Sequence, residues 1–246
     1  MSGDKKSTLL EHLQELRKRV IKSVIAVLIT TILSFVFAKQ IFEFLIAPTG
    51  GIDLIYIEMT EMIGTYMKVC LASGIILGMP YLVYQFIMFL SPALTSRERK
   101  AVYLILPWIT LMFAGGVVFG YYILLPPATN FLLTFGSDIA TPQIKVGNYI
   151  SIVTRLLLAI GLVFEMPVVT TFLARIGVIT PKWLSDKRRV VIIFAFILAA
   201  IITPTFDPIN QCLVAAPLVV LYEISIWLAK IFARKRQEAV QSTPSL

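Results

Sequence analysis

The sequence has few of the residues on which soluble enzymes depend. Only 15% of its 246 residues are charged, and it contains one histidine and two cysteines. A soluble domain carries about a quarter charged residues, so the low charge argues against a soluble globular protein. The isolated Cys70 and Cys212 form neither a metal motif nor a disulfide framework. No H-E-x-x-H, G-x-S-x-G or Walker motif occurs, so we expect no enzyme, no cofactor and no metal site.

The sequence instead contains long apolar runs, and 58% of its residues are hydrophobic. About 20 apolar residues are needed for one helix to cross a bilayer. Backbone groups in lipid must be paired internally, so runs of this length predict helices. We therefore predict an all-α polytopic membrane protein with six transmembrane helices in a single domain over residues 1–232. The expected spans are 20–38, 63–89, 101–125, 149–173, 190–202 and 212–232.

Basic residues predict the orientation of these spans. Eighteen of the 22 Lys and Arg residues lie in the N-terminal segment, the loops after spans two and four, and the C-terminal tail. Cytoplasmic segments carry such an excess, so both termini are predicted to face the cytoplasm. This arrangement explains the net charge of +8 without nucleic acid. The tail, residues 233–246, is predicted to be disordered.

Other features refine the expected membrane domain. The fifth span, Val190–Ile202, offers about 20 Å of helix against about 30 Å of hydrocarbon. We favour local thinning of the bilayer or tilting of neighbouring helices to accommodate it. The outer loops are long enough to be structured, and Pro127–Phe135 is predicted as a short surface helix. Gly74–Gly78 and Gly116–Gly120 match GxxxG and predict close helix packing within the chain.

The N-terminal segment is predicted to form an amphipathic helix on the membrane surface. Thr8 and Glu11 form a T-x-x-E capping box at its start. Apolar residues then recur on one helical face, as in interfacial helices. Glu15 lies four residues before Arg19, the spacing of an ordinary helix ion pair. The lone His12 is expected to be solvated.

Two carboxylates stand out on this basic side of the membrane. Glu15 is one, and Glu98 is the other, in a second capping box with Thr95 at the start of span three. Local helix structure alone explains both residues. The same two residues are also well placed to bind a cationic peptide, since an arginine–carboxylate contact is stronger than a neutral hydrogen bond.

Glu165 is an acid well inside the fourth apolar run. An ionisable residue at such depth costs about 2.5–3.5 kcal/mol on insertion scales and is by default a functional candidate. Pro167 cannot donate a hydrogen bond to the carbonyl of Val163, which leaves a polar, bendable point beside the carboxyl group. The alternative is a structural carboxyl bonded to a neighbouring helix, for instance to Gln85. We favour the functional interpretation.

Four motifs in order give the chain a resemblance to the TatC family, the multi-spanning subunits of the twin-arginine protein translocase. H-L-x-E-L-R-x-R stands at residues 12–19, and F-x-x-P-A-L-x-x-x-E-R stands at residues 89–99. F-E-x-P occupies residues 164–167 in span four. The outer T-P-x-D pattern stands at 203–207 with one extra residue before Asp207. The resemblance covers residues 12–230.

This resemblance implies a core receptor subunit for folded proteins that carry twin-arginine signal peptides. It implies that Glu15 and Glu98 recognise the arginine pair on the cytoplasmic face, and that Arg17 and Phe89 help to shape that site. It further implies a multimeric complex in the bacterial inner membrane, driven by the proton-motive force.

Further residues acquire expected roles through the same resemblance. Glu165, with Gln85, is expected to contact single-span TatA and TatB partners within the membrane. Pro48 and Asp207 become functional candidates on the outer face. The alternative function is a proton-coupled small-molecule transporter that uses Glu165 as its carrier. That alternative gives no use to the cytoplasmic carboxylates and lacks the internal repeats common among transporters.

Overall fold

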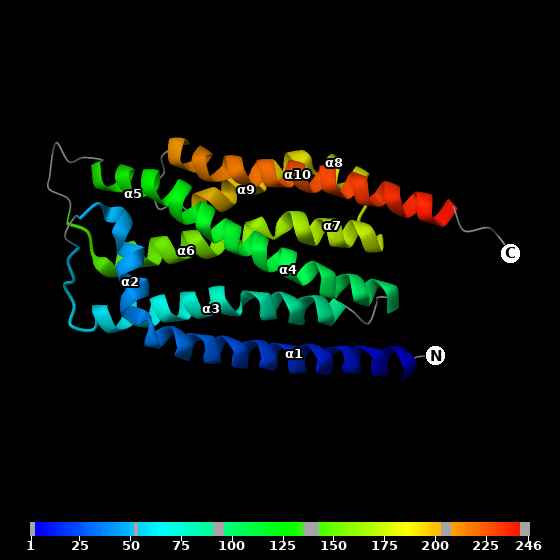
Figure 1. The fold of residues 1–246 in the computed structure, drawn as a ribbon, viewed down its shortest axis with the longest axis horizontal. Helices are drawn as coiled ribbons and strands as arrows, with labels where there is room; N and C mark the ends of the chain where they lie inside the picture. The colour runs from blue at the N-terminus through cyan, green and yellow to red at the C-terminus, as the bar shows by residue number, and fades with distance from the viewer. Residues whose placement is uncertain (1–2, 52–53, 91–95, 135–142, 203–207, 242–246) are drawn as a thin grey trace. The chain divides into compact units, whose positions relative to one another are not determined.

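Helices make up all the regular secondary structure that the computed structural model describes, which covers residues 3–51, 54–90, 96–134, 143–202 and 208–241 (Figure 1). An isolated bridge pairs Ile55 with Lys145. The helices are α1 (Gly3–Val36), α2 (Ala38–Ile46), α3 (Glu61–Leu90), α4 (Ser96–Phe119), α5 (Leu125–Thr134), α6 (Val146–Phe164), α7 (Met166–Ile176), α8 (Pro181–Asp186), α9 (Arg188–Ile202) and α10 (Pro208–Gln241).

Five helical stretches within the described residues are long and apolar enough to cross a membrane. They are His12–Val36, Glu61–Phe89, Leu106–Phe131, Val146–Ala174 and Gln211–Ile231. The sixth predicted span is α9, whose 15 residues give about 22 Å of helix. The prediction of an all-α polytopic membrane protein is therefore confirmed, and α9 is the short span that the sequence indicated.

The first and last helices run further than expected. The predicted amphipathic segment and the first span form one continuous helix, α1, because no glycine or proline interrupts residues 4–36. A separate helix lying in the membrane plane is therefore not observed. The tail that was predicted to be disordered from residue 233 is helical to Gln241. Its residues include good helix formers such as Ala, Arg, Lys and Gln, and no proline occurs before Pro244.

The third span also continues beyond its predicted end. Instead of a separate surface helix over Pro127–Phe135, a π-helical segment (Gly120–Leu124) joins α4 directly to α5. The N–H of Leu125 donates to the carbonyl of Gly120, a bond across five residues that marks the wider turn. Pro126 and Pro127 have no N–H to donate to the preceding turn, so the wider spacing lets the helix continue through them.

The described chain divides into two compact units, and each has its own packing. The first unit comprises residues 1–43 and 66–110, and in it α1 contacts α3. The hydroxyl of Thr30 donates to the carbonyl of Gly74 at 2.7 Å. A Cβ atom on Gly78 would lie 3.3 Å from the Thr30 hydroxyl oxygen. The prediction that Gly74–Gly78 serves packing within the chain is confirmed.

The second unit comprises residues 44–65 and 111–246. A core cluster forms where α7, α8 and α10 meet, and it contains Ala174, Leu184, Tyr222, Ile226 and Ala229. The Tyr222 hydroxyl donates to the Leu184 carbonyl at 2.7 Å, which fixes α8 against α10. A Cβ on Gly116 would lie 2.8 Å from Phe164, so the second GxxxG pair also packs within the chain. That prediction is confirmed as well.

Candidate functional site

The N-terminal half of α1 lies along the C-terminal half of α3, and the two helices run in opposite directions. The ring of His12 stacks on that of Phe89, with centroids 4.4 Å apart and planes 26° apart. About two turns further along α1 from His12, Arg19 donates to the side chain of Gln85 at 3.2 Å. Both contacts belong to the first unit, so they define one helical face on which residues 12, 15 and 19 succeed each other.

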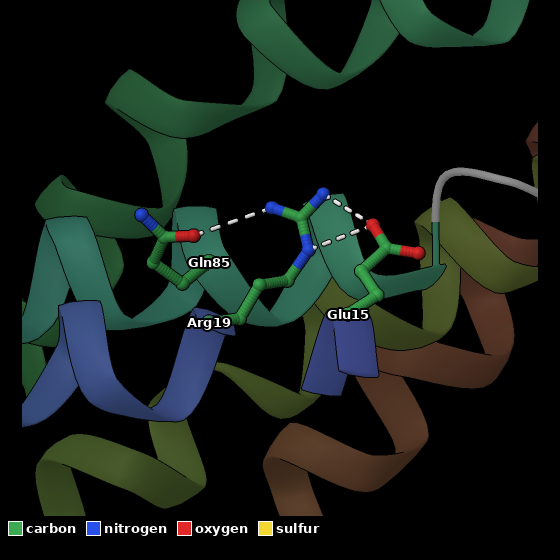
Figure 2. Close-up of polar contacts among 3 residues, drawn as sticks. All are labelled: Glu15, Arg19 and Gln85. Carbon is green, nitrogen blue, oxygen red and sulfur yellow. Dashed lines mark hydrogen bonds and ion pairs between the residues drawn. The ribbon is translucent and has the colours of Figure 1, made fainter. Parts of the chain in front are cut away.

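Glu15 lies between these two contacts and is held by Arg19. The Nε and Nη2 atoms of Arg19 donate to Oε1 of Glu15 at 3.0 and 2.6 Å (Figure 2). The predicted helix pair is therefore confirmed. Its side chains keep 21% and 30% of their exposure, so the pair is partly open to solvent. Both bonds use the same oxygen, and Oε2 of Glu15 makes no hydrogen bond to any side chain or backbone group in the described part of the chain.

Gln85 accepts a hydrogen bond from the opposite side of the Arg19 guanidinium. Its side chain is 5% exposed, and its Oε1 accepts the bond from Nη1 of Arg19 (Figure 2). The sequence suggested Gln85 as a hydrogen-bond partner for Glu165, and within the first unit the structure shows Arg19 as the partner of its Oε1. A guanidinium carries five donors in a rigid fork, so Arg19 can reach Glu15 on its own helix and Gln85 on α3 at once.

The structure describes the other predicted residues of the peptide site only in part. Arg17 is exposed on α1, and Phe89 is half-buried beneath His12. Glu98 lies in the first turn of α4. The side chain of Glu98 and the whole of Thr95 lie outside the described residues, so the predicted capping box stays a prediction.

Glu165 is buried at a break in the fourth span. The predicted single helix is two helices, because Glu165 separates α6 from α7. Pro167 has no N–H, and α6 closes with a tighter turn in which the Glu165 N–H donates to the carbonyl of Leu162 at 3.1 Å. The helix resumes at once, since the N–H of Val169 donates to the carbonyl of Glu165 at 2.9 Å.

The carboxyl group at this break has no partner of its own. Glu165 is 4% exposed, and neither Oε1 nor Oε2 has a hydrogen-bond partner among the described residues. An unsatisfied buried polar group costs about 1–3 kcal/mol, and a charged one costs more. A residue that destabilises the isolated chain in this way is a candidate for an intermolecular contact.

The described parts of the outer loops are held by contacts within the second unit, which agrees with the prediction of structured loops. Glu61 accepts hydrogen bonds from the N–H groups of Ile57 at 3.0 Å and Gly147 at 3.1 Å. The hydroxyl of Tyr149 donates to the Leu45 carbonyl at 3.0 Å. Pro48 lies in the wall of a pocket of about 550 Å³, whose lining also includes Thr49, Gly50, Pro126, Pro127, Thr129, Asn130 and Thr134. The other outer-face candidate, Asp207, lies outside the described residues.

Sequence reasoning missed two parts of this arrangement. His12 was expected to be solvated, and although it is exposed it stacks on Phe89. Its spacing of three and seven residues from Glu15 and Arg19 is the signal that places all three on one face. Glu61 was not singled out, and its place just before an apolar run is the only hint of its role in fastening the outer loops.

Comparisons with known proteins identify the family of this chain. Residues 11–217 match the family described as "Sec-independent protein translocase protein (TatC)". The Sec-independent protein translocase protein TatC of Aquifex aeolicus is 44% identical over 94% of this chain and 98% of its own length. That of Carboxydothermus hydrogenoformans is 41% identical over 94% of this chain and 96% of its own length.

More distant sequences and solved structures agree. The chloroplastic protein TATC of Arabidopsis thaliana is 34% identical over 95% of this chain and 69% of its own length. A crystal structure described as "Twin Arginine Translocase Receptor- TatC" matches with a TM-score of 0.80 at 44% identity. It covers 90% of this chain and 99% of the solved one. The chain therefore belongs to the TatC family of Sec-independent protein translocase proteins.

Proposed function

We propose that this protein is the receptor subunit of the twin-arginine translocase, and that Glu15 and Glu98 bind the arginine pair of a signal peptide. The observation that carries the proposal is the Glu15 carboxylate, which is fixed by Arg19 through one oxygen while the other oxygen is unpaired among the described residues (Figure 2). The matching crystal structure is described as that of a receptor, which agrees with this assignment.

Family membership defines the broad class of the protein. It is a core component of the twin-arginine translocase in the inner membrane, which it crosses several times, and not an enzyme. The alternative of a proton-coupled small-molecule transporter is wrong, because the matching relatives are protein translocase proteins along nearly their whole length. Glu165 therefore needs a role other than carrying protons for a small solute.

The chemistry of Glu15 suits an arginine ligand. The carboxylate already accepts a guanidinium at 2.6 Å from Arg19, so its surroundings tolerate that geometry. A signal-peptide arginine could add to the unpaired Oε2 without displacing Arg19. A carboxylate offers about four lone-pair sites, so two guanidinium groups can share it. Glu98 would supply the second carboxylate for the second arginine.

The proposal requires the N-terminal half of α1 to face the cytoplasm. The excess of Lys and Arg in the N-terminal segment, the alternate loops and the tail supports that orientation. Precursor proteins are made in the cytoplasm, so Glu15 and Glu98 would then stand where signal peptides arrive. The absence of a nucleotide motif in the sequence agrees with transport driven by the proton-motive force.

Glu165 fits a second part of the same proposal, in which single-span TatA and TatB subunits dock inside the membrane. Its buried carboxyl group has no hydrogen-bond partner within the described chain, so a polar group on a partner helix would relieve the cost of burying it. Pro48 and Asp207 are proposed as outer-face residues of the same assembly. Pro48 lines an open pocket that a partner segment could enter.

Crosslinking of a twin-arginine signal peptide to the purified protein tests the receptor role. A photoreactive group placed beside the arginine pair should crosslink to the wild type, and crosslinking should fall when both arginines become lysines. Glu15→Gln and Glu98→Lys should each weaken the arginine-dependent crosslink. Glu43→Gln is the matched control, because Glu43 also pairs with a cation four residues away, Lys39 at 3.8 Å, yet lies in α2, beyond the far end of the first span.

The outcomes separate the possibilities. A crosslink that needs the two arginines, falls in both test variants and survives in Glu43→Gln would support the receptor role. Equal crosslinking of arginine and lysine peptides to the wild type would overturn it. An arginine-dependent crosslink that is untouched by Glu15→Gln and Glu98→Lys would overturn the assignment of these two carboxylates.

A further inference from the structure

We propose that His12 is a further binding residue for the signal peptide, and that its imidazole forms the flat surface on which an arginine guanidinium stacks while it pairs with Glu15. This inference rests on the proposed function and adds a residue to the same site. The observation behind it is the stack of His12 on Phe89, with centroids 4.4 Å apart.

The helix geometry places His12 beside the open carboxylate. His12 and Glu15 are three residues apart on α1, so they are neighbours on its surface, separated by about 4.5 Å of rise. Both belong to the face turned toward α3, since His12 contacts Phe89 and Glu15 reaches Gln85 through Arg19. Gln85 and Phe89 are themselves four residues apart on α3. Glu15 therefore has the Arg19–Gln85 bond on one side and the aromatic stack on the other.

The stack also fixes how His12 presents its ring. One face of the imidazole covers Phe89, with the two planes 26° apart. His12 is nevertheless exposed, whereas Phe89 is half-buried. Since the stack occupies one face of the ring, we infer that the exposed surface of His12 includes the other face. A ring held by a partly buried aromatic neighbour loses less side-chain freedom on binding than a free one. Phe89 acts in this scheme as the positioning residue for His12.

This arrangement distinguishes arginine from lysine. The guanidinium is planar and weakly hydrated, so it can stack on a ring while its edge donates to a carboxylate. The ammonium of lysine is compact and strongly hydrated, so it can donate to a carboxylate, but it has no flat face with which to stack on a ring at the same time. Glu15 alone attracts any cation, whereas the pair of Glu15 with His12 selects a planar one.

Equilibrium binding of fluorescent signal peptides to the purified full-length protein in detergent tests the inference. The peptides carry two arginines, or one lysine at either position, or two lysines. We expect His12→Ala to weaken binding of the two-arginine peptide by about two- to fivefold, the range of a stacked cation at an exposed site. Binding of the two-lysine peptide should not change, so the preference for arginine falls by the same factor.

Two further variants separate stacking from general effects on α1. His12→Phe keeps an aromatic ring that can pack on Phe89, and it should retain most of the arginine preference. Gln14→Ala is the matched control, because Gln14 is exposed on the same turn of α1 as His12. Thermal unfolding of each variant checks that α1 remains packed.

The results distinguish the stacking role of His12 from the receptor role of the protein. An unchanged arginine preference in His12→Ala, or equal losses in His12→Ala and His12→Phe, would overturn the stacking role while leaving the receptor role intact. A wild-type protein that binds arginine and lysine peptides equally would overturn both. A lower affinity for all four peptides alike would assign His12 to the packing of α1 and overturn the inference.

Discussion

Thr30 donates a hydrogen bond of 2.7 Å to the backbone carbonyl of Gly74, and this bond joins α1 to α3 where the two backbones lie close together. A Cβ atom added to Gly74 would meet the Thr31 hydroxyl oxygen and would lie 2.7 Å from the Thr31 Cα atom. Only glycine fits here without a shift of the helices. The residues of the proposed peptide site lie on the same two helices, nearer the N-terminus of α1 and the C-terminus of α3.

Gly74→Ala should therefore destabilise the protein. Overpacking of a close contact costs about 1–3 kcal/mol, and the obstacle here is backbone rather than a movable side chain. Thermal unfolding in detergent should show a lower midpoint. Gly64→Ala is the control on the same helix, since nothing lies within 4 Å of its added Cβ and alanine favours helix. An equal midpoint for Gly74→Ala and wild type would contradict the close approach.

Arg19→Lys should affect peptide binding more than stability. Lysine can approach Glu15, but it has no planar fork with which to hold Glu15 and Gln85 together. The partly exposed ion pair contributes only about 0.2–1 kcal/mol, so the unfolding midpoint should move little. Arginine-dependent peptide binding should fall several-fold, because Glu15 loses its fixed orientation.

The control for Arg19→Lys is Lys39→Gln, which removes the exposed i,i+4 pair of Lys39 with Glu43. It should leave peptide binding at the wild-type level. If Arg19→Lys binds the two-arginine peptide as tightly as the wild type does, Arg19 has no positioning role for Glu15.

Tyr149→Phe should loosen the outer face. The Tyr149 side chain is 4% exposed, and its hydroxyl donates to the Leu45 carbonyl at 3.0 Å. Loss of a buried hydrogen bond costs about 1 kcal/mol, so the unfolding midpoint should drop measurably. Tyr122→Phe is the matched control, since Tyr122 is 64% exposed. Equal midpoints for the two variants would show that the Tyr149 bond does not stabilise this region.

The sequence predicted those features that depend on neighbouring residues along the chain. Apolar runs located the spans, and the spacing of Glu15 and Arg19 predicted their ion pair. Pro167 predicted a weak point beside Glu165, although the full separation of α6 from α7 was not expected. In each case the physical cause acts within one stretch of the sequence, so no knowledge of the tertiary fold is needed.

Features that depend on the register of two helices were not predictable. The stack of His12 on Phe89 and the bond from Arg19 to Gln85 require α1 and α3 to pair in one antiparallel register. Glycine spacing indicated that α3 packs closely, but it did not name Thr30 as the partner. The end of α10 was also missed, because a polar, charged sequence such as residues 233–241 is compatible with either helix or coil.

Glu165→Leu should stabilise the isolated protein and weaken its assembly. The carboxyl group is buried, and neither of its oxygens has a hydrogen-bond partner in the described residues, so an apolar side chain removes a desolvation cost. The unfolding midpoint in detergent should rise. Co-purification of single-span partner subunits should fall, because the polar group proposed to meet them is gone. Glu165→Gln should keep part of that assembly, since an amide can still donate and accept hydrogen bonds.

A rise in stability together with a loss of partners distinguishes an intermolecular role from a structural one. If Glu165 instead stabilised the chain through its own contacts, Glu165→Leu would lower the midpoint. Glu223→Gln provides the comparison, because Glu223 is exposed and pairs with Arg188 at 2.8 Å. That variant should lower the midpoint slightly and leave partner binding unchanged. Retention of the partners at the wild-type level in Glu165→Leu would exclude this carboxyl group from the assembly surface.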